Sequence, residues 1–178
     1  VVSEAGEFQI IEQFFTYPSF GAWKSQGVGD DCAIIDTGAG RLAVTCDMTA
    51  LGTHFFPDAD PEDVGYKALA VNLSDLAAAG AVPRAFFLSI GLPRRDDGWL
   101  ADFSRGLMAL AHESGCALLG GDTTRTPEID GRHAPATISI TAMGDLPAGM
   151  GLTRSGAQPG DDIWVSGTVG DAYAALMC

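Results

Sequence analysis

The chain has 178 residues, 47% of them hydrophobic and 19% charged, which is typical of a soluble globular protein with one full domain and room for part of another. Its net charge of −13 argues against nucleic acid and anionic membranes as partners, and no apolar run approaches the roughly 20 residues of a membrane span. The N-terminus lacks a signal-peptide pattern and the four cysteines lack C-x-x-C spacing, so we expect a cytoplasmic protein with reduced thiols and no zinc site.

Hydrophobic periodicity and turn residues predict the elements in chain order. They are a helix over 6–15, strands over 32–35 and 41–47, a helix over 61–80, a strand over 85–92, a helix over 97–114, strands over 116–119, 136–144 and 162–167, and a helix from 170. A glycine turn at 38–40 joins the first two strands into a hairpin. Residues 48–56 fit a loop or a strand, and residues 126–135 are expected to form a loop outside the core.

The helix over 61–80 has the clearest boundary signals. Asp60 suits its N-cap and Pro61 its first turn, while Gly80 suits a left-handed residue at its C-terminus. Asp75 stands near the C-terminal end, where the helix dipole disfavours negative charge and an unpaired buried carboxylate is costly. We therefore expect a cation to face Asp75. The structural alternative is a buried Arg partner or a turn of the helix that faces solvent.

Four aspartates are predicted at the ends of separate elements, where one sheet could bring them together: Asp31, Asp47, Asp75 and Asp122. Carboxylates without a Cys or His cluster suit a hard cation such as Mg²⁺, which bridges carboxylates to substrate phosphates. Phosphoryl transfer is the corresponding reaction class. The alternative is that these acids are ordinary turn and strand-end residues. The chain has no G-x-x-x-x-G-K-[ST] loop, no G-x-G-x-x-G fingerprint and no G-x-S-x-G motif.

The fold class expected from these elements is α+β, with a mixed β-sheet backed by two long helices. Residues 147–160 are rich in Gly and Pro and predict a linker, so we place a domain boundary near residue 155. This gives an N-terminal domain over 1–155 and the start of a second, α/β domain over 156–178. Because the chain stops inside an apolar helix, we expect it to be part of a longer protein.

Seven segments of the chain resemble the thiamine-monophosphate kinase family. They are Gly6–Phe8, Gly29–Ala33, Gly52–Phe55, Tyr66–Ala77, Gly120–Arg125, Leu152–Ala157 and Ser166–Asp171. This family is grouped with aminoimidazole ribonucleotide synthetase and selenophosphate synthetase. The resemblance implies an N-terminal domain of the aminoimidazole ribonucleotide synthetase type, which forms a homodimer by joining sheets; Phe86, Phe87 and Leu92 are candidates for that surface. It also implies that ATP phosphorylates thiamine monophosphate to thiamine diphosphate with the help of Mg²⁺.

The resemblance also implies roles for individual residues. The metal ligands would be Asp31, Asp47, Asp75 and Asp122, with Thr45 and Cys46 lining the same site. His54 would contact thiamine monophosphate, whereas Gly121, Asp122 and Arg154 would contact ATP. No side chain is expected to act as a nucleophile, since catalysis would rest on positioning and on metal. Cys46 departs from the family, which usually has Thr there, and a thiol is a poor ligand for Mg²⁺.

Two other functions remain open at this point. A second enzyme of the same superfamily would also use ATP, but His54 and the run Asp122–Arg125 would be the wrong residues for it. A non-catalytic dimerisation module would have lost some of the acids, and all four are present. Because the family carries further contacts on a second domain, we expect the 178-residue chain alone to show little phosphoryl transfer.

Overall fold

The structure, a computed structural model, describes residues 7–15, 25–26, 28 and 30–177. Its first elements are the short helix α1 (Glu7–Ile10), the π-helix η1 (Ile11–Phe15), and the strands β1 (Ser25–Gln26), β2 (Ala33–Asp36) and β3 (Arg41–Ala50). Next come α2 (Pro61–Ala78), β4 (Val82–Leu92), α3 (Asp97–Ser114), β5 (Ala117–Arg125), β6 (Glu128–Ile129), β7 (Arg132–His133), β8 (Thr137–Leu146) and α4 (Asp171–Leu176). The predicted helix start at Gly6, residues 16–24, Gly27, Gly29 and the terminal Cys178 lie outside the described residues.

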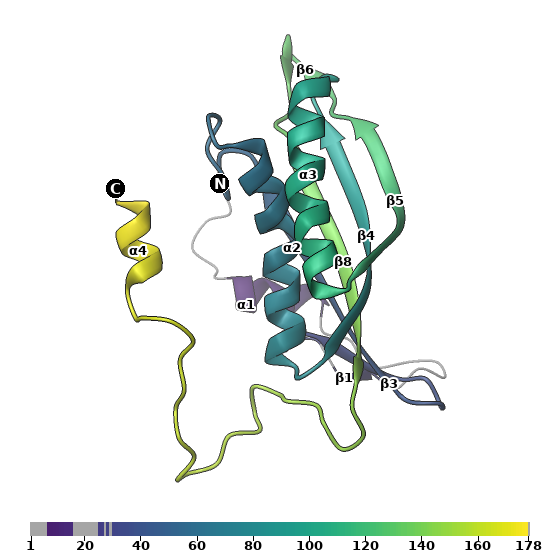
Figure 1. The fold of residues 1–178 in the computed structure, drawn as a ribbon, viewed down its shortest axis with the longest axis vertical. Coiled ribbons are helices and arrows are strands. Elements are labelled where there is room, and N and C mark those ends of the chain that lie inside the picture. The colour runs from purple at the N-terminus through teal and green to yellow at the C-terminus, as the bar shows by residue number, and fades with distance from the viewer. Residues whose placement is uncertain (1–6, 16–24, 27, 29, 178) are drawn as a thin grey trace.

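A mixed sheet forms the centre of the molecule, with α2 and α3 packed on one of its faces (Figure 1). The six strands lie in the order β1-β2-β3-β8-β4-β5. The pair β4–β5 is parallel and is connected through α3, whereas the other neighbouring pairs are antiparallel. This arrangement confirms the predicted α+β class and the predicted hairpin of β2 and β3.

The alternating pattern of β8 determines which face of the sheet is buried. Ile138, Ile140 and Ala142 are almost completely buried against α2 and its neighbours. Their neighbours Thr137, Ser139 and Thr141 are only partly buried and point to the opposite side, which we call the open face. The half-buried strand predicted from this alternation is confirmed.

Capping residues fix both long helices where the sequence predicted. The Asp60 side chain accepts a hydrogen bond from the Glu62 backbone N–H, and Pro61 occupies the first turn of α2. Gly80 adopts the predicted left-handed conformation, with a φ of 75°, and its backbone N–H and that of Ala81 donate to the last carbonyl groups of α2.

Two glycines let α2 and α3 approach closely, since a Cβ at Gly65 or Gly106 would clash with the backbone of the facing helix.

Two predicted strand ends are wrong. β3 does not end at Asp47 but continues to Ala50, because β8 offers it an antiparallel partner along its whole length. The strand predicted over 116–119 continues through the glycine pair to Arg125, since it pairs with β4 throughout, so Asp122 lies inside β5 and not at its end.

Two further segments differ from expectation. Residues 126–135 contain the small hairpin β6–β7, which turns at Asp130 and Gly131, both with positive φ. The strand predicted over 162–167 is absent, because these residues are exposed and none of the described strands pairs with them; Trp164 is 88% exposed. The helix predicted after Gly170 is present as α4. None of the helices in the described part of the chain is both long and apolar enough to cross a membrane.

Candidate active site

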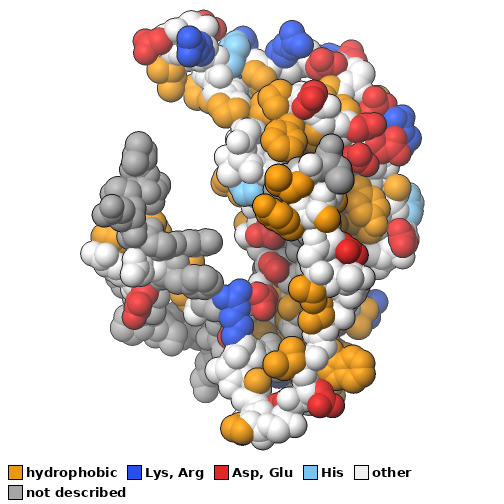
Figure 2. All heavy atoms as spheres, turned by 90° about the vertical axis from the view of Figure 1, so that its left-hand side faces the viewer, with side chains coloured by type: hydrophobic (Ala, Val, Ile, Leu, Met, Phe, Trp, Pro, Cys, Tyr) orange, Lys and Arg blue, Asp and Glu red, His pale blue; other side chains and the backbone are white. Residues whose placement is uncertain are grey.

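A pocket of about 390 Å³ brings together three of the four predicted metal ligands. It is lined by Ile11, Asp30, Asp31, Ala33, Val44, Thr45, Cys46, Asp47, Asp75 and Arg154. Asp31 precedes β2, Asp47 lies on β3, and Asp75 lies in the last turns of α2. In Figure 2 acidic side chains gather in the hollow of the face shown, beside a basic side chain.

Hydrogen bonds between α2 and β3 shape the wall of this pocket. The Thr45 hydroxyl donates to Asp75 Oδ2 at 2.7 Å, which orients that carboxylate. The fully buried Asn72 donates to the Ala68 carbonyl at 3.0 Å and accepts from the Asp47 backbone N–H at 3.2 Å. This contact holds β3 beyond Val44, where its pairing with β2 has stopped. Asn72 lies one helical turn from Asp75, and the helix face that carries both was expected from the sequence to form a site, although no role was assigned to Asn72 itself.

A buried thiol lies under the carboxylates and was also missed. Cys32 Sγ donates to the Asp75 carbonyl at 3.3 Å. Burial, together with the negative charges of Asp75 and Asp31, raises the pKa of the Cys32 thiol to about 12. Cys32 therefore stays neutral and adds no charge to the pocket.

A cation was expected to face Asp75, and the pocket does contain one, Arg154 from the predicted linker, but it pairs with a different carboxylate. Its guanidinium bonds to Asp31 Oδ1 at 2.6 Å, and its backbone N–H donates to Asp30 Oδ1 at 2.7 Å. The hydrogen bond and the charge of Asp31 raise the pKa of Arg154 above its ordinary value. Arg154 thus pairs most directly with Asp31, while the Asp75 carboxylate is held by Thr45.

Asp122 does not reach the pocket within one chain. It pairs in register with Ser89, which pairs with Ser139 and then with Met48, so all four positions share the open face. Asp47 pairs with Ile140 on the face that carries the helices. The expectation that one sheet gathers all four acids is therefore wrong, and the role of Asp122 as a ligand stays a prediction.

The remaining predicted residues lie around the pocket in different ways. The Cys46 side chain points to the open face, where Thr141 donates to its sulfur at 3.3 Å, although Cys46 also lines the pocket. His54 is exposed, and its Nδ1 accepts from the Ala50 backbone N–H at 3.0 Å. At Gly121 a Cβ would clash with the Leu88 carbonyl, so that position requires glycine.

The donor set of the pocket fits a hard cation. In the described parts of the chain no three His, Cys, Asp or Glu side chains converge closely enough to hold a metal as they stand. The carboxylates of Asp31, Asp47 and Asp75 and the Thr45 hydroxyl nevertheless line one pocket, and oxygen donors of this kind are those that Mg²⁺ prefers. One of these carboxylates is taken by Arg154 in this state.

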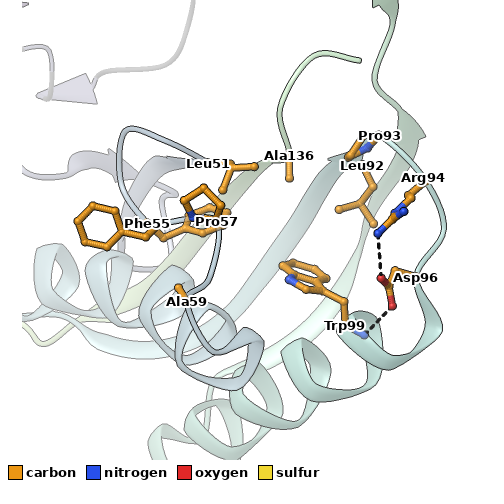
Figure 3. Close-up of a pocket in the computed structure, with 11 residues that line it drawn as sticks. Leu51, Phe55, Pro57, Ala59, Leu92, Pro93, Arg94, Asp96, Trp99 and Ala136 are labelled. Carbon is orange, nitrogen blue, oxygen red and sulfur yellow. Dashed lines mark hydrogen bonds and ion pairs between the residues drawn. The ribbon is translucent and has the colours of Figure 1, made fainter. Parts of the chain in front are cut away.

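A second, more apolar pocket of about 210 Å³ lies between the loop before α2 and the start of α3 (Figure 3). Phe55 and Phe56, the sequence neighbours of His54, line it from one side. Trp99 faces them from α3, with its ring stacked on Phe103 at a centroid distance of 5.0 Å. Asp96 forms an ion pair with Arg94 at 3.8 Å at the rim. The pocket is therefore aromatic inside and charged at its edge.

Comparison with protein families matches residues 29–146 to the model "AIR synthase related protein, N-terminal domain". Among curated proteins, the thiamine-monophosphate kinases of Salmonella typhimurium and of Escherichia coli K12 are each 44% identical over 173 residues. Each alignment covers 96% of this chain and 51% of the relative. The chain therefore spans about half the length of the curated relatives that it matches.

Similar solved structures include proteins of the same kind as these curated relatives. The structure titled "AaThiL complexed with AMPPCP and TMP" matches with a TM-score of 0.75 and 31% identity, over 84% of this chain and 46% of the other. The thiamine-monophosphate kinase of Stenotrophomonas maltophilia K279a matches with a TM-score of 0.71 and 46% identity, over 85% of this chain and 46% of the other. A HypE–HypF complex, 19% identical with a TM-score of 0.64, shares the fold.

Proposed function

This chain belongs to the AIR synthase related protein family through its N-terminal domain, and from this membership we propose that its protein phosphorylates thiamine monophosphate with ATP, forming thiamine diphosphate. The observation that carries the proposal is the pocket in which Asp31, Asp47 and Asp75 meet. The resemblance read from the sequence agrees with the relatives, which are named thiamine-monophosphate kinase. One similar structure is described as a complex with AMPPCP and TMP. The similarity to these kinases favours this function over another superfamily enzyme or a non-catalytic module.

We propose that Asp31, Asp47, Asp75 and the Thr45 hydroxyl hold Mg²⁺. Cys46 would line this site with its backbone, and its thiol would not be a ligand. Bound there, Mg²⁺ would neutralise charge on the phosphates that react. The chain's own residues prepare this arrangement: Thr45 orients the Asp75 carboxylate, and the buried Asn72 holds the Asp47 backbone in place. Gly121 and Arg154 remain the proposed ATP contacts, and His54 the proposed contact to thiamine monophosphate.

The position of Asp122 supports the proposed homodimer. Asp122 lies on the open face, opposite the face that carries α2 and the acids bonded to it. If Asp122 is a metal ligand, it must therefore serve the pocket of a second copy of the chain rather than its own. We further propose that the protein acts in the cytoplasm, and that residue 155 separates the N-terminal domain from a second domain.

The test is a phosphoryl-transfer assay on the native protein with Mg²⁺, ATP and thiamine monophosphate. We expect thiamine diphosphate to form, and we expect Asp75→Asn to lower the rate by orders of magnitude because it removes charge that holds the cation. Without metal, Asp75→Asn should be no less stable than the native protein, since it relieves repulsion among the carboxylates.

Asp145→Asn is the matched control, because Asp145 is an exposed carboxylate that pairs with Arg84 outside the pocket. It should keep the native rate. The proposal would be contradicted if the native protein formed no thiamine diphosphate. An Asp75→Asn variant that unfolds more easily but turns over normally would show that this carboxylate has a structural role instead.

A further inference from the structure

A short segment of the predicted linker crosses the end of α2 and reaches the acidic pocket. We call residues 150–154 the strap. Three hydrogen bonds tie it to the domain: Arg41 Nη1 to the Met150 carbonyl at 2.9 Å, the Leu152 N–H to the Ala79 carbonyl at 3.1 Å, and the Arg154 N–H to Asp30 Oδ1 at 2.7 Å. The strap is therefore part of the domain surface, and the chain leaves the domain only beyond it.

The last residue of the strap enters the pocket with its side chain. The Arg154 guanidinium lies 2.6 Å from Asp31 Oδ1, and both side chains are partly exposed. The pocket lining otherwise carries the carboxylates of Asp30, Asp47 and Asp75. A guanidinium keeps its positive charge at every physiological pH, so it can neutralise part of this charge when no metal is bound.

A divalent cation and Arg154 compete for the same carboxylate. A cation that binds both oxygens of Asp31 would use Oδ1, the oxygen that now accepts from the guanidinium. It would also place two positive charges beside the guanidinium, and like charges at such short range repel. Cation binding at Asp31 and the Arg154–Asp31 ion pair therefore weaken each other.

We propose that Arg154 is a clasp that a divalent cation opens. In the metal-free protein Arg154 holds the strap on Asp30 and Asp31, and a cation that takes Asp31 releases the guanidinium and loosens the strap. The released guanidinium is then free to turn toward the phosphates of a nucleotide. This inference rests on the proposed cation site. It makes the segment beyond residue 155 responsive to the state of the pocket, because the strap is what leads into it.

Mg²⁺ alone, titrated into the native protein by calorimetry without nucleotide, tests the clasp. Arg154→Gln removes the competing charge, and we expect it to bind Mg²⁺ about two- to fivefold more tightly, the range set by a partly exposed ion pair. Arg84→Gln is the matched control, because it also removes one guanidinium from an ion pair, that with Asp145. It should bind Mg²⁺ as the native protein does.

Amide hydrogen exchange provides a second readout that does not depend on activity. In the native protein, Mg²⁺ should speed exchange of the Arg154 amide, whereas the Ala81 amide, bonded to the Leu76 carbonyl at 2.8 Å, should not respond. The clasp is overturned if Arg154→Gln binds Mg²⁺ no more tightly than Arg84→Gln, or if Mg²⁺ does not change the exchange rate of the Arg154 amide. In either case the cation site still stands. If none of the three proteins binds Mg²⁺, the cation site fails and the clasp fails with it.

Discussion

At the scale of single residues, the carboxylates of the pocket differ in what holds them. The Asp75 carboxylate accepts a hydrogen bond from the Thr45 hydroxyl, whereas the Asp31 carboxylate accepts one from the guanidinium of Arg154, a distant residue in the chain. Asp47 is fixed through its backbone, which donates to Asn72. A cation would therefore meet one carboxylate that is oriented for it and another that must first lose a partner.

The buried thiol under the site leads to a pH-dependent prediction. Because the pKa of Cys32 rises from an ordinary 9.0 to about 12 on folding, the folded state favours the protonated thiol. Its contribution to stability is complete below pH 9 and is lost as the pH rises from 9 toward 12. Urea unfolding at pH 8 and pH 10.5 should show this loss in the native protein and a smaller loss in Cys32→Ala.

Cys46→Ala is the control for that series, since Cys46 is an exposed thiol. It should keep the native dependence on pH. Equal losses in the native protein and in Cys32→Ala would show that other groups control stability in this range.

Part of the site could be predicted from the sequence and part could not. Asp31, Asp47 and Asp75 were predicted together because each was expected at the end of a strand or helix, beside glycines or small residues, although Asp47 in fact lies inside β3. Asn72 and Cys32 could not be assigned, because their roles depend on contacts between α2 and its neighbours. Such contacts leave no periodic signal in the sequence.

The misplacement of Asp122 has a specific cause. The register of β4 and β5 shifts after Leu118, which pairs with Phe86, because Gly120 rather than Leu119 pairs with Phe87. One extra residue in a strand moves every later side chain to the other face of the sheet. Asp122 therefore points to the open face, and a sequence pattern without the partner strand cannot show this.

At the scale of elements, the contact between α2 and α3 depends on two glycines. Gly65 faces the Phe103 carbonyl and Gly106 faces the Glu62 carbonyl, with no space for a Cβ at either position. The helices themselves were predicted within about two residues, because caps and periodicity are local signals. Their close approach was not predicted, since glycine inside a helix is locally unfavourable and its benefit lies on the facing helix.

Substitution at these glycines tests the packing. Gly106→Ala should destabilise the protein by about 1–3 kcal/mol, because the new methyl group overlaps the Glu62 backbone and the helices must move apart. In Gly98→Ala, in the first turn of α3, the new methyl group lies 3.7 Å from Asp96 Oδ1, so this change should be neutral or slightly stabilising. Chemical denaturation of both variants is the measurement. Equal stability of the two variants would show that the contact between α2 and α3 can accommodate a methyl group at position 106.

At the scale of the whole molecule, the sheet is covered by helices on one face only, in the part of the chain described. The open face carries exposed apolar side chains, with Met48 60% and Phe87 40% exposed. Of the residues predicted for the dimer surface, Phe87 lies there, whereas Phe86 is completely buried in the core and Leu92 packs against the core. Exposed apolar area of this kind is characteristic of protein interfaces.

The oligomeric state can be tested on this face. Phe87→Glu places a charge in the middle of the proposed interface and should convert a dimer into a monomer, as measured by sedimentation at micromolar concentration. Tyr66→Glu is the control, because Tyr66 is a comparably exposed aromatic residue on α2. It should leave the dimer intact. A native protein that sediments as a monomer would remove the route by which Asp122 reaches an acidic pocket.

The central position of β8 also affects the order of events during synthesis. β8 is the last strand of the sheet in sequence, yet it lies between β3 and β4 and pairs with both. Until residues 137–146 have left the ribosome, the hairpin of β2 and β3 and the unit β4–α3–β5 have no strand to join them. Both halves then expose unpaired inner edges, which are sites for wrong pairing with other chains. The nascent chain should therefore depend most on chaperones just before β8 emerges from the ribosome.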